Sequence, residues 1–177
     1  DLATQHSSLP RLPTNMAPKD VDDPYADYSE QDLLQGLKQI RLTRDVGSQY
    51  EYSNLGVGLL ADLLARRAGT DYATLVRRRI TGPLGMHDTV IGLSPDQKAR
   101  LAQPHDAYMR PTPPWNLNAL VGAGGLRSDA DDLLTLLGAA LGRVRGPLAE
   151  DLAAMRARRA DVFAPAVGIG IVLNVMK

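Results

Sequence analysis

The sequence lacks cysteine, an excess of either charge, and any long apolar run. The absence of cysteine excludes disulfides, zinc–thiolate sites and thiol catalysis. Lysine and arginine total 20, as do aspartate and glutamate, whereas binding to nucleic acid or to an anionic membrane surface favours a basic excess. No apolar run approaches the roughly 20 residues that span a bilayer. We therefore predict no nucleic-acid partner and no membrane span.

Residues that could hold a metal or a cofactor are also scarce. The three histidines lie far apart in the sequence and form no ligand-like pair. Gly122, Gly124 and Gly125 lack the preceding strand and the rest of the fingerprint of a phosphate-binding loop, so a tight turn explains them better. The sequence thus predicts neither a metal nor a cofactor.

What the sequence does contain is a series of helix signals. Four prolines exclude a long helix or a central strand from residues 1–28, which we expect to form an irregular loop. Beyond them, capping residues and apolar positions at helical spacing predict a first helix that starts at Ser29. The same signals predict further helices over about 55–68, 72–80, 95–101, 128–141 and 148–158. The Gly-Pro-Leu-Gly segment over residues 82–85 is expected to end the helix over 72–80.

The C-terminal segment has a different pattern. Residues 167–175 are apolar and β-branched, which predicts a strand that has no clear partner. The expected fold is therefore mainly α, with a loop segment over residues 1–28, a helical lobe over 29–160 and the start of a sheet strand over 161–177. A strand cut off from its sheet would be poorly ordered or would pair with a second copy, giving a homodimer through residues 167–175.

The stretch from Gly47 to Gly56 holds the strongest candidates for chemistry. Residues two apart in an extended segment point to the same side, so Tyr52 and Asn54 would face one cavity just before a helix begins. A phenol and an amide presented together can move a proton and orient a substrate amide. The same residues also fit a structural interpretation, in which Tyr52 is a half-buried aromatic residue and Asn54 is the helix N-cap.

Four segments resemble, in the same order, motifs of the class C β-lactamases and of related penicillin-binding proteins and esterases. They are Thr4–Pro10, similar to Thr-His-Thr-Ser-Gly-Leu-Pro; Tyr52-Ser53-Asn54, similar to the second active-site motif; Pro83–Thr89, similar to Pro-Leu-Gly-Met-x-Asp-Thr; and Ala123–Leu133, similar to Gly-Gly-Leu-x-Ser-Thr-x-x-Asp-Leu. The resemblance covers nearly the whole chain. It implies the helical lobe of the β-lactamase/DD-peptidase fold, with its last strand separated from the antiparallel sheet.

The resemblance also implies an activity. The reaction would be acyl transfer, in which a serine attacks a β-lactam, a D-alanyl peptide or an ester, and water then releases the acyl group. Tyr52 matches the general base, and Asn54 matches the side chain that hydrogen-bonds the amide carbonyl of the substrate. The segment Ser-Ser-Leu-Pro-Arg over residues 7–11 resembles the periplasmic penicillin-binding proteins with carboxypeptidase or endopeptidase activity more than it resembles the class C β-lactamases. We therefore expect an exported, periplasmic protein.

The sequence departs from the family pattern because two of its motifs are missing. No serine has a lysine three residues later, and neither Lys-Thr-Gly nor His-x-Gly occurs in residues 1–177. We expect the chain to be a truncated piece that is inactive alone, with the nucleophile before Asp1 and the third motif after Lys177. The cations that would let Tyr52 act as a base belong to those motifs. A stand-alone, non-catalytic helical binding module is the alternative.

Overall fold

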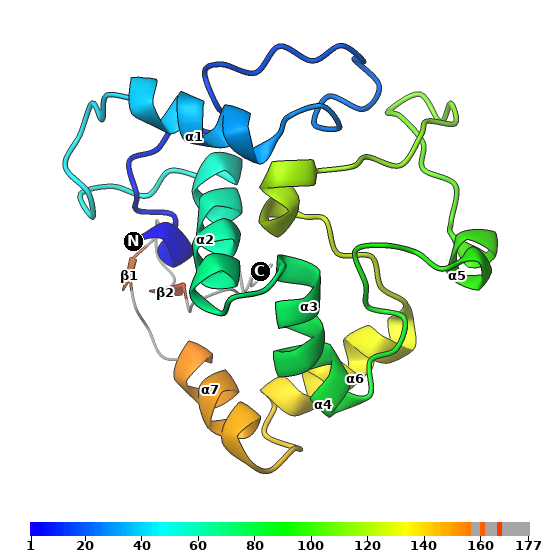
Figure 1. Ribbon diagram of the computed structural model, residues 1–177. Coiled ribbons are helices and arrows are strands. Elements are labelled where there is room, and N and C mark those ends of the chain that lie inside the picture. Colours follow the sequence, from blue (N-terminus) through cyan, green and yellow to red (C-terminus); the bar gives the residue numbers. More distant parts are fainter. Residues whose placement is uncertain (157–159, 162–165, 168–177) are drawn as a thin grey trace.

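The computed structural model of the chain describes residues 1–156, 160–161 and 166–167, and this part is mainly helical (Figure 1). Its α-helices are α1 (Glu30–Gln39), α2 (Asn54–Arg67), α3 (Tyr72–Val76), α4 (Gly82–Leu84), α5 (Pro95–Arg100), α6 (Ala130–Ala140) and α7 (Pro147–Arg156). Two 3₁₀ segments, η1 (Leu2–Thr4) and η3 (Asn118–Ala123), and one π-helical segment, η2 (Arg77–Thr81), complete the helical elements. Each helix predicted from the sequence is present.

Local capping explains where several helices begin. Ser29 and Asp32 form a reciprocal capping box at α1, because the Asp32 amide donates to Ser29 Oγ and the Ser29 amide donates to Asp32 Oδ2. Ser94 and Gln97 form the same box at α5, as predicted. At α6 the N-cap is Asp129, whose side chain accepts from the Asp132 amide at 2.8 Å.

The helix predicted over residues 72–80 does not end at the Gly-Pro pair, so that prediction is wrong. Pro83 has no N–H to donate, and the Gly82 amide reaches back five residues to the carbonyl oxygen of Arg77. The helix therefore continues through η2 into α4. It ends at Gly85, which adopts a left-handed conformation with φ of 71°.

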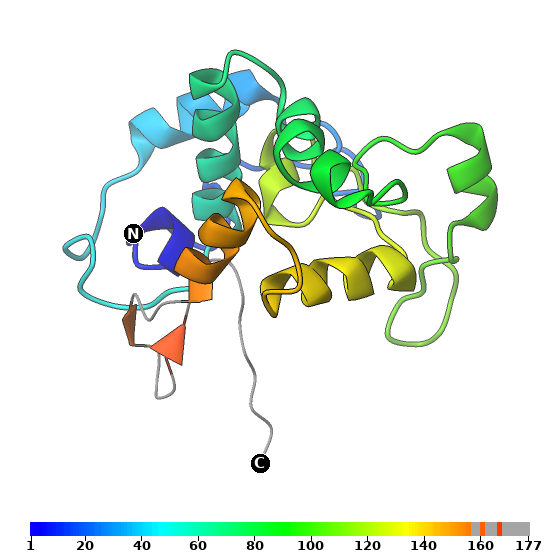
Figure 2. The same ribbon diagram turned by 90° about the horizontal axis from the view of Figure 1, so that it is seen from below.

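The main core forms where the N-terminal loop packs on α1, α2 and η3. Its buried members are Leu9, Tyr25, Tyr28, Leu33, Leu55 and Leu120. Half of these lie in residues 1–28. The proline-rich loop is irregular, as expected, and these buried residues show that it is also a packed part of the fold. In both views the N-terminal segment lies beside α2 (Figures 1 and 2), and in Figure 1 α6 and α7 lie together at the end of the molecule opposite α1.

The approach of η3 to α2 is close enough to require glycine. A Cβ atom placed on Gly122 would lie 2.3 Å from Ala61 Cβ and 2.9 Å from the carbonyl oxygen of Val57. Gly122→Ala is therefore expected to lower the free energy of unfolding by about 1–3 kcal/mol, the usual cost of overpacking. Denaturant titration measures this. A Cβ on Gly92 would meet nothing within 4 Å, so Gly92→Ala is the matched control, and equal losses in both variants would contradict the close approach.

The C-terminal predictions lie largely outside the described residues. Strands β1 (Ala160–Asp161) and β2 (Ala166–Val167) pair antiparallel, with Ala160 opposite Val167. Apart from Val167, the predicted strand over residues 167–175 and a homodimer through it fall outside the part that the structure describes. Among the described helices, none combines the length and the apolar character that crossing a membrane requires.

Candidate functional site

The segment that carries Tyr52 and Asn54 is fixed by the buried residue between them. Ser53 is completely buried and is the N-cap of α2: its Oγ accepts from the Gly56 amide at 2.8 Å and donates to the carbonyl oxygen of Pro10 at 2.7 Å. The alternative in which Asn54 is the N-cap is therefore wrong. The side chain of Asn54 is not needed to start the helix.

The loop at the start of the chain holds this segment from the other side. Gln5 receives two hydrogen bonds: its Oε1 accepts from the Ser53 amide and its carbonyl oxygen accepts from the Glu51 amide, each at 2.8 Å. The His6 carbonyl oxygen accepts from the Gly47 amide at 2.8 Å. Two segments that are more than 40 residues apart in the sequence thus form one hydrogen-bonded unit.

The two predicted site residues differ in their surroundings. Tyr52 is 47% exposed, and the guanidinium carbon of Arg11 lies 5.7 Å from the centre of its ring. Asn54 is partly buried, and its side-chain nitrogen donates to the hydroxyl of Tyr25 at 3.4 Å. The phenol is therefore open to solvent, and the amide is anchored to the core through Tyr25.

Arg11 is one of three residues near the site that the sequence analysis did not identify. Its carbonyl oxygen accepts from the amides of Asn54 at 2.9 Å and Leu55 at 3.3 Å, which places it directly on the start of α2. The sequence signal was only a basic residue after Leu-Pro. Gln5 and Tyr25 were also missed, because each contacts the site through a hydrogen bond across many residues of chain.

A second polar cluster joins the other two family-like segments. The buried carboxylate of Asp132, in the first turn of α6, accepts from the Asp88 amide and from Thr89 Oγ1, both at 2.8 Å. Thr89 Oγ1 also lies 2.7 Å from Ser128 Oγ. Arg100 donates to the Asp88 carboxylate at 2.6 Å and thereby lowers the pKa of that carboxyl group. This cluster connects secondary-structure elements and has a structural role.

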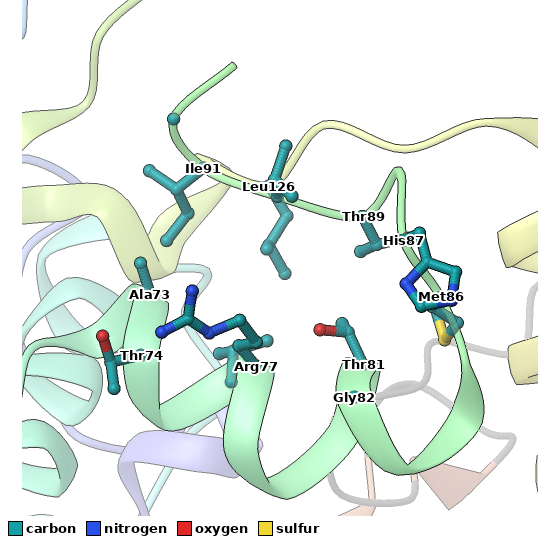
Figure 3. Close-up of a pocket in the computed structure, with 13 residues that line it drawn as sticks. Ala73, Thr74, Arg77, Thr81, Gly82, Met86, His87, Thr89, Ile91 and Leu126 are labelled. Atoms are coloured by element: carbon teal, nitrogen blue, oxygen red, sulfur yellow. The ribbon is translucent and has the colours of Figure 1, made fainter. Parts of the chain in front are cut away.

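Two cavities of the described part lie away from Tyr52 and Asn54. One of about 310 Å³ lies between the α3–η2–α4 helix and the extended residues 89–92, with Arg77, Thr81 and His87 on its wall beside apolar side chains (Figure 3). Another, of about 830 Å³, lies between that helix and the pair α6 and α7. Neither of these two cavities is lined by Tyr52 or Asn54. Within the described residues no group of three or more acidic or histidine side chains could hold a metal ion.

Comparison with known proteins agrees with the motif pattern. Residues 1–174 match the family described as Beta-lactamase. The chain belongs to the beta-lactamase family. It is similar to the D-alanyl-D-alanine-carboxypeptidase/endopeptidase AmpH of Escherichia coli, with 38% identity over 135 residues, which is 76% of this chain and 34% of that protein.

Solved structures extend this family match to the fold. The chain is similar to a beta-lactamase/D-alanine carboxypeptidase from Yersinia pestis, with a TM-score of 0.76, 29% identity and coverage of 96% of this chain and 50% of that one. It is also similar to a class C beta lactamase from Rhodobacter sphaeroides, with a TM-score of 0.79, 26% identity and coverage of 96% and 46%. The chain thus spans about a third of the length of the carboxypeptidase/endopeptidase that it matches. Its mainly helical structure matches part of the class C beta-lactamase fold.

Proposed function

We propose that residues 1–177 form the helical lobe of a penicillin-recognising serine hydrolase, in which Tyr52 is the general base and Asn54 binds the amide of the substrate. The single observation that carries this proposal is the hydrogen-bonded unit of Gln5, Arg11 and Ser53, because it holds the phenol and the amide at the start of α2. An active site requires its side chains to be held in place by neighbouring residues through packing and hydrogen bonds. The nucleophilic serine lies outside residues 1–177.

The proposed reaction proceeds in two steps of acyl transfer. Tyr52 acts in this step as a phenolate, whose oxygen takes the proton of the serine hydroxyl while the serine oxygen bonds to the carbonyl carbon of the substrate. The bond from that carbon to nitrogen breaks, and the proton passes to the departing nitrogen. Water then attacks the acyl carbon while Tyr52 takes a proton from it. The bond from that carbon to the serine oxygen breaks, the proton passes to the serine, and the acid is released. Asn54 orients the substrate's amide carbonyl through its side-chain amide, which the contact to Tyr25 steadies.

An exposed apolar face supports the proposal that another lobe packs on this one. Four leucines of α6 and the residue that follows it, Leu133, Leu134, Leu137 and Leu141, are 53% to 63% exposed. A contiguous apolar patch on a protein surface marks an interaction site. The segments that carry the nucleophile and the third motif would supply the partner surface.

The proposed substrates are D-alanyl peptides and β-lactams, and the proposed location is the periplasm. The similarity to a D-alanyl-D-alanine-carboxypeptidase/endopeptidase supports these substrates and this location, as does the Ser-Ser-Leu-Pro-Arg sequence of residues 7–11. The second candidate is a stand-alone, non-catalytic helical binding module. It is favoured by the absence of a Ser-x-x-Lys motif from residues 1–177.

Labelling with a fluorescent penicillin separates the two candidates. The extended protein denotes the proposed parent protein, in which a Ser-x-x-Lys segment precedes residues 1–177 and the third motif follows them. We expect a covalent label on the extended protein and none on residues 1–177 alone, because the matching serine is missing there. If the extended protein stays unlabelled at a concentration that saturates known penicillin-binding proteins, the binding-module hypothesis replaces the enzymatic one.

A further inference from the structure

The cavity of about 310 Å³ between the α3–η2–α4 helix and residues 89–92, which we call the Arg77 cavity, has the features of a small-ligand site. Its volume lies at the lower end of the roughly 300–1,000 Å³ that such sites occupy. The side chains of Ile91 and Leu126 lie on one side of it, and those of Arg77 and Thr81 lie on the helix side (Figure 3). An apolar wall with a few polar groups can hold and orient a small molecule.

The hydroxyl group of Thr81 is a buried polar group that lacks a partner in the described part of the chain. The residue is 4% exposed, and its side chain forms no hydrogen bond with any described residue. Its oxygen points toward the side chain of Arg77 (Figure 3). Arg44 Nε is the one side-chain atom of the described residues that is both fully enclosed and unpartnered. The Thr81 oxygen is therefore not sealed in by protein, and a ligand in the cavity can reach it.

Thr89, on the same wall, shows what the other buried threonine of the cavity does. Its Oγ1 donates to the Asp132 carboxylate at 2.8 Å and lies 2.7 Å from Ser128 Oγ. Buried hydroxyl groups almost always have such partners. The hydroxyl of Thr81 faces the cavity instead, so a ligand there would supply the partner that the described protein does not.

Arg77 adds a positive charge that no ion pair neutralises within the described residues. Its charge is felt by Asp71 through space: hydrogen bonds from Thr74 chiefly lower the pKa of the Asp71 carboxyl group, and Arg77 adds a smaller contribution. Arg77 is exposed and lines the cavity, so its guanidinium group is open both to solvent and to a bound molecule.

The wide turn η2 places these two polar groups together. Arg77 and Thr81 are its first and last residues, and residues four apart lie on one face of a helix. The turn is closed by the hydrogen bond from the Gly82 amide to the Arg77 carbonyl oxygen. A Cβ atom on Gly82 would lie 2.6 Å from that oxygen, so this turn requires glycine. Turns of this π type are rare inside helices and occur frequently at functional sites.

We propose that the Arg77 cavity is a binding site for a small apolar monocarboxylate, separate from Tyr52 and Asn54. The guanidinium group of Arg77 would hold the carboxylate through its N–H groups, and the Thr81 hydroxyl would donate to the same carboxylate. The apolar body of the ligand would replace water against Ile91 and Leu126. One cation among apolar side chains suits a singly charged head with an apolar body better than a phosphate group, which carries more charge and more bound water.

Nuclear magnetic resonance titration of the 177-residue chain with hexanoate and hexanamide tests this inference. The two probes have the same number of heavy atoms and differ in charge, and the signals are the methyl groups of Thr81, Ile91 and Leu126. We expect hexanoate to bind with a Kd on the order of 1 mM. It should bind about tenfold more tightly than hexanamide, the size of a hydrogen bond to a charged group.

Substitutions assign the preference to the two polar groups. Arg77→Gln should remove the difference between hexanoate and hexanamide, because glutamine has no charge. Arg78→Gln is the matched control, since Arg78 is the next exposed arginine of η2 and lines the larger cavity instead. It should leave the preference unchanged. Thr81→Val should weaken hexanoate binding about fivefold, the size of one neutral hydrogen bond, and Thr81→Ser should retain most of the affinity.

Unfolding experiments separate a ligand-binding role of Thr81 from a structural one. Thr81→Val should leave the free energy of unfolding almost unchanged, because the hydroxyl has no partner to lose in the described part. A clear loss of stability would show that the hydroxyl is bonded within the fold and would overturn its role as a ligand donor.

Three titration results would overturn the proposed site. They are methyl signals that neither probe shifts, equal affinity for hexanoate and hexanamide, and a preference for hexanoate that survives Arg77→Gln. None of them would bear on the proposed function of Tyr52 and Asn54, because neither residue lines the Arg77 cavity.

Discussion

Replacement of Asp132 with alanine is expected to lower the free energy of unfolding by about 2–4 kcal/mol, because two donors would lose their acceptor in a buried place. The carboxylate is nearly enclosed and accepts from the Asp88 amide and from Thr89 Oγ1. Its own amide, which donates to the Asp129 cap, is unaffected by the substitution. The loss would therefore report the side chain and not the start of α6. Thermal or denaturant unfolding measures it.

Asp131 provides the matched control for Asp132. It lies next to Asp132 in the first turn of the same helix and is exposed. Asp131→Ala removes the same charge from the same end of the helix, so its effect should stay within about 1 kcal/mol, the size of a helix-dipole contribution. Equal destabilisation by the two substitutions would show that Asp132 acts only through helix-start charge, and would contradict its role in joining α6 to residues 88 and 89.

Tyr52→Phe should slow acylation of the extended protein by a fluorescent penicillin by about 10²–10⁴-fold, the usual contribution of a general base. The substitution removes one oxygen atom and keeps the ring on which Arg11 stacks. The expected loss is therefore chemical, and unfolding experiments should show almost unchanged stability because the side chain is about half exposed and the ring is kept. Stopped-flow or gel-based labelling rates provide the measurement.

Tyr108→Phe is the control for Tyr52→Phe. Tyr108 also has an arginine over its ring, but it is exposed in the loop that follows α5, which lies at the edge of the molecule in both views (Figures 1 and 2). Its labelling rate should match that of the unmodified protein. A Tyr52→Phe protein that acylates at the same rate would remove the general-base assignment and leave Asn54 as the only proposed site residue of the chain.

Local signals in the sequence predicted most of the helices. The capping boxes at Ser29 and Ser94 depend on residues three apart, so the sequence alone shows both partners. The end of the helix over residues 72–80 was predicted wrongly for the opposite reason. Proline and glycine normally stop a helix, but here a five-residue hydrogen bond from Gly82 to Arg77 carries the chain past them. Such a rearrangement depends on packing and leaves no distinct pattern in the sequence.

The sequence predicts the candidate residues of the site but not the contacts that hold them in place. Tyr52 and Asn54 were visible because their types and spacing resemble a family motif. The hydrogen bond from the Ser53 amide to Gln5 and the contact of Arg11 with the Tyr52 ring join segments about 40 residues apart or more, and no local rule pairs them. The alternative that assigned Asn54 to capping failed because the neighbouring Ser53 occupies that role.

A crystal structure of the extended protein acylated by a penicillin would test the central claim most directly. We expect the hydroxyl oxygen of Tyr52 to lie about 2.6–3.2 Å from the oxygen of the acylated serine, within hydrogen-bond reach. We also expect the Asn54 side chain to donate to the amide carbonyl of the bound acyl group. An acylated serine whose oxygen lies beyond hydrogen-bond reach of Tyr52, with Asn54 still bound only to Tyr25, would contradict the account.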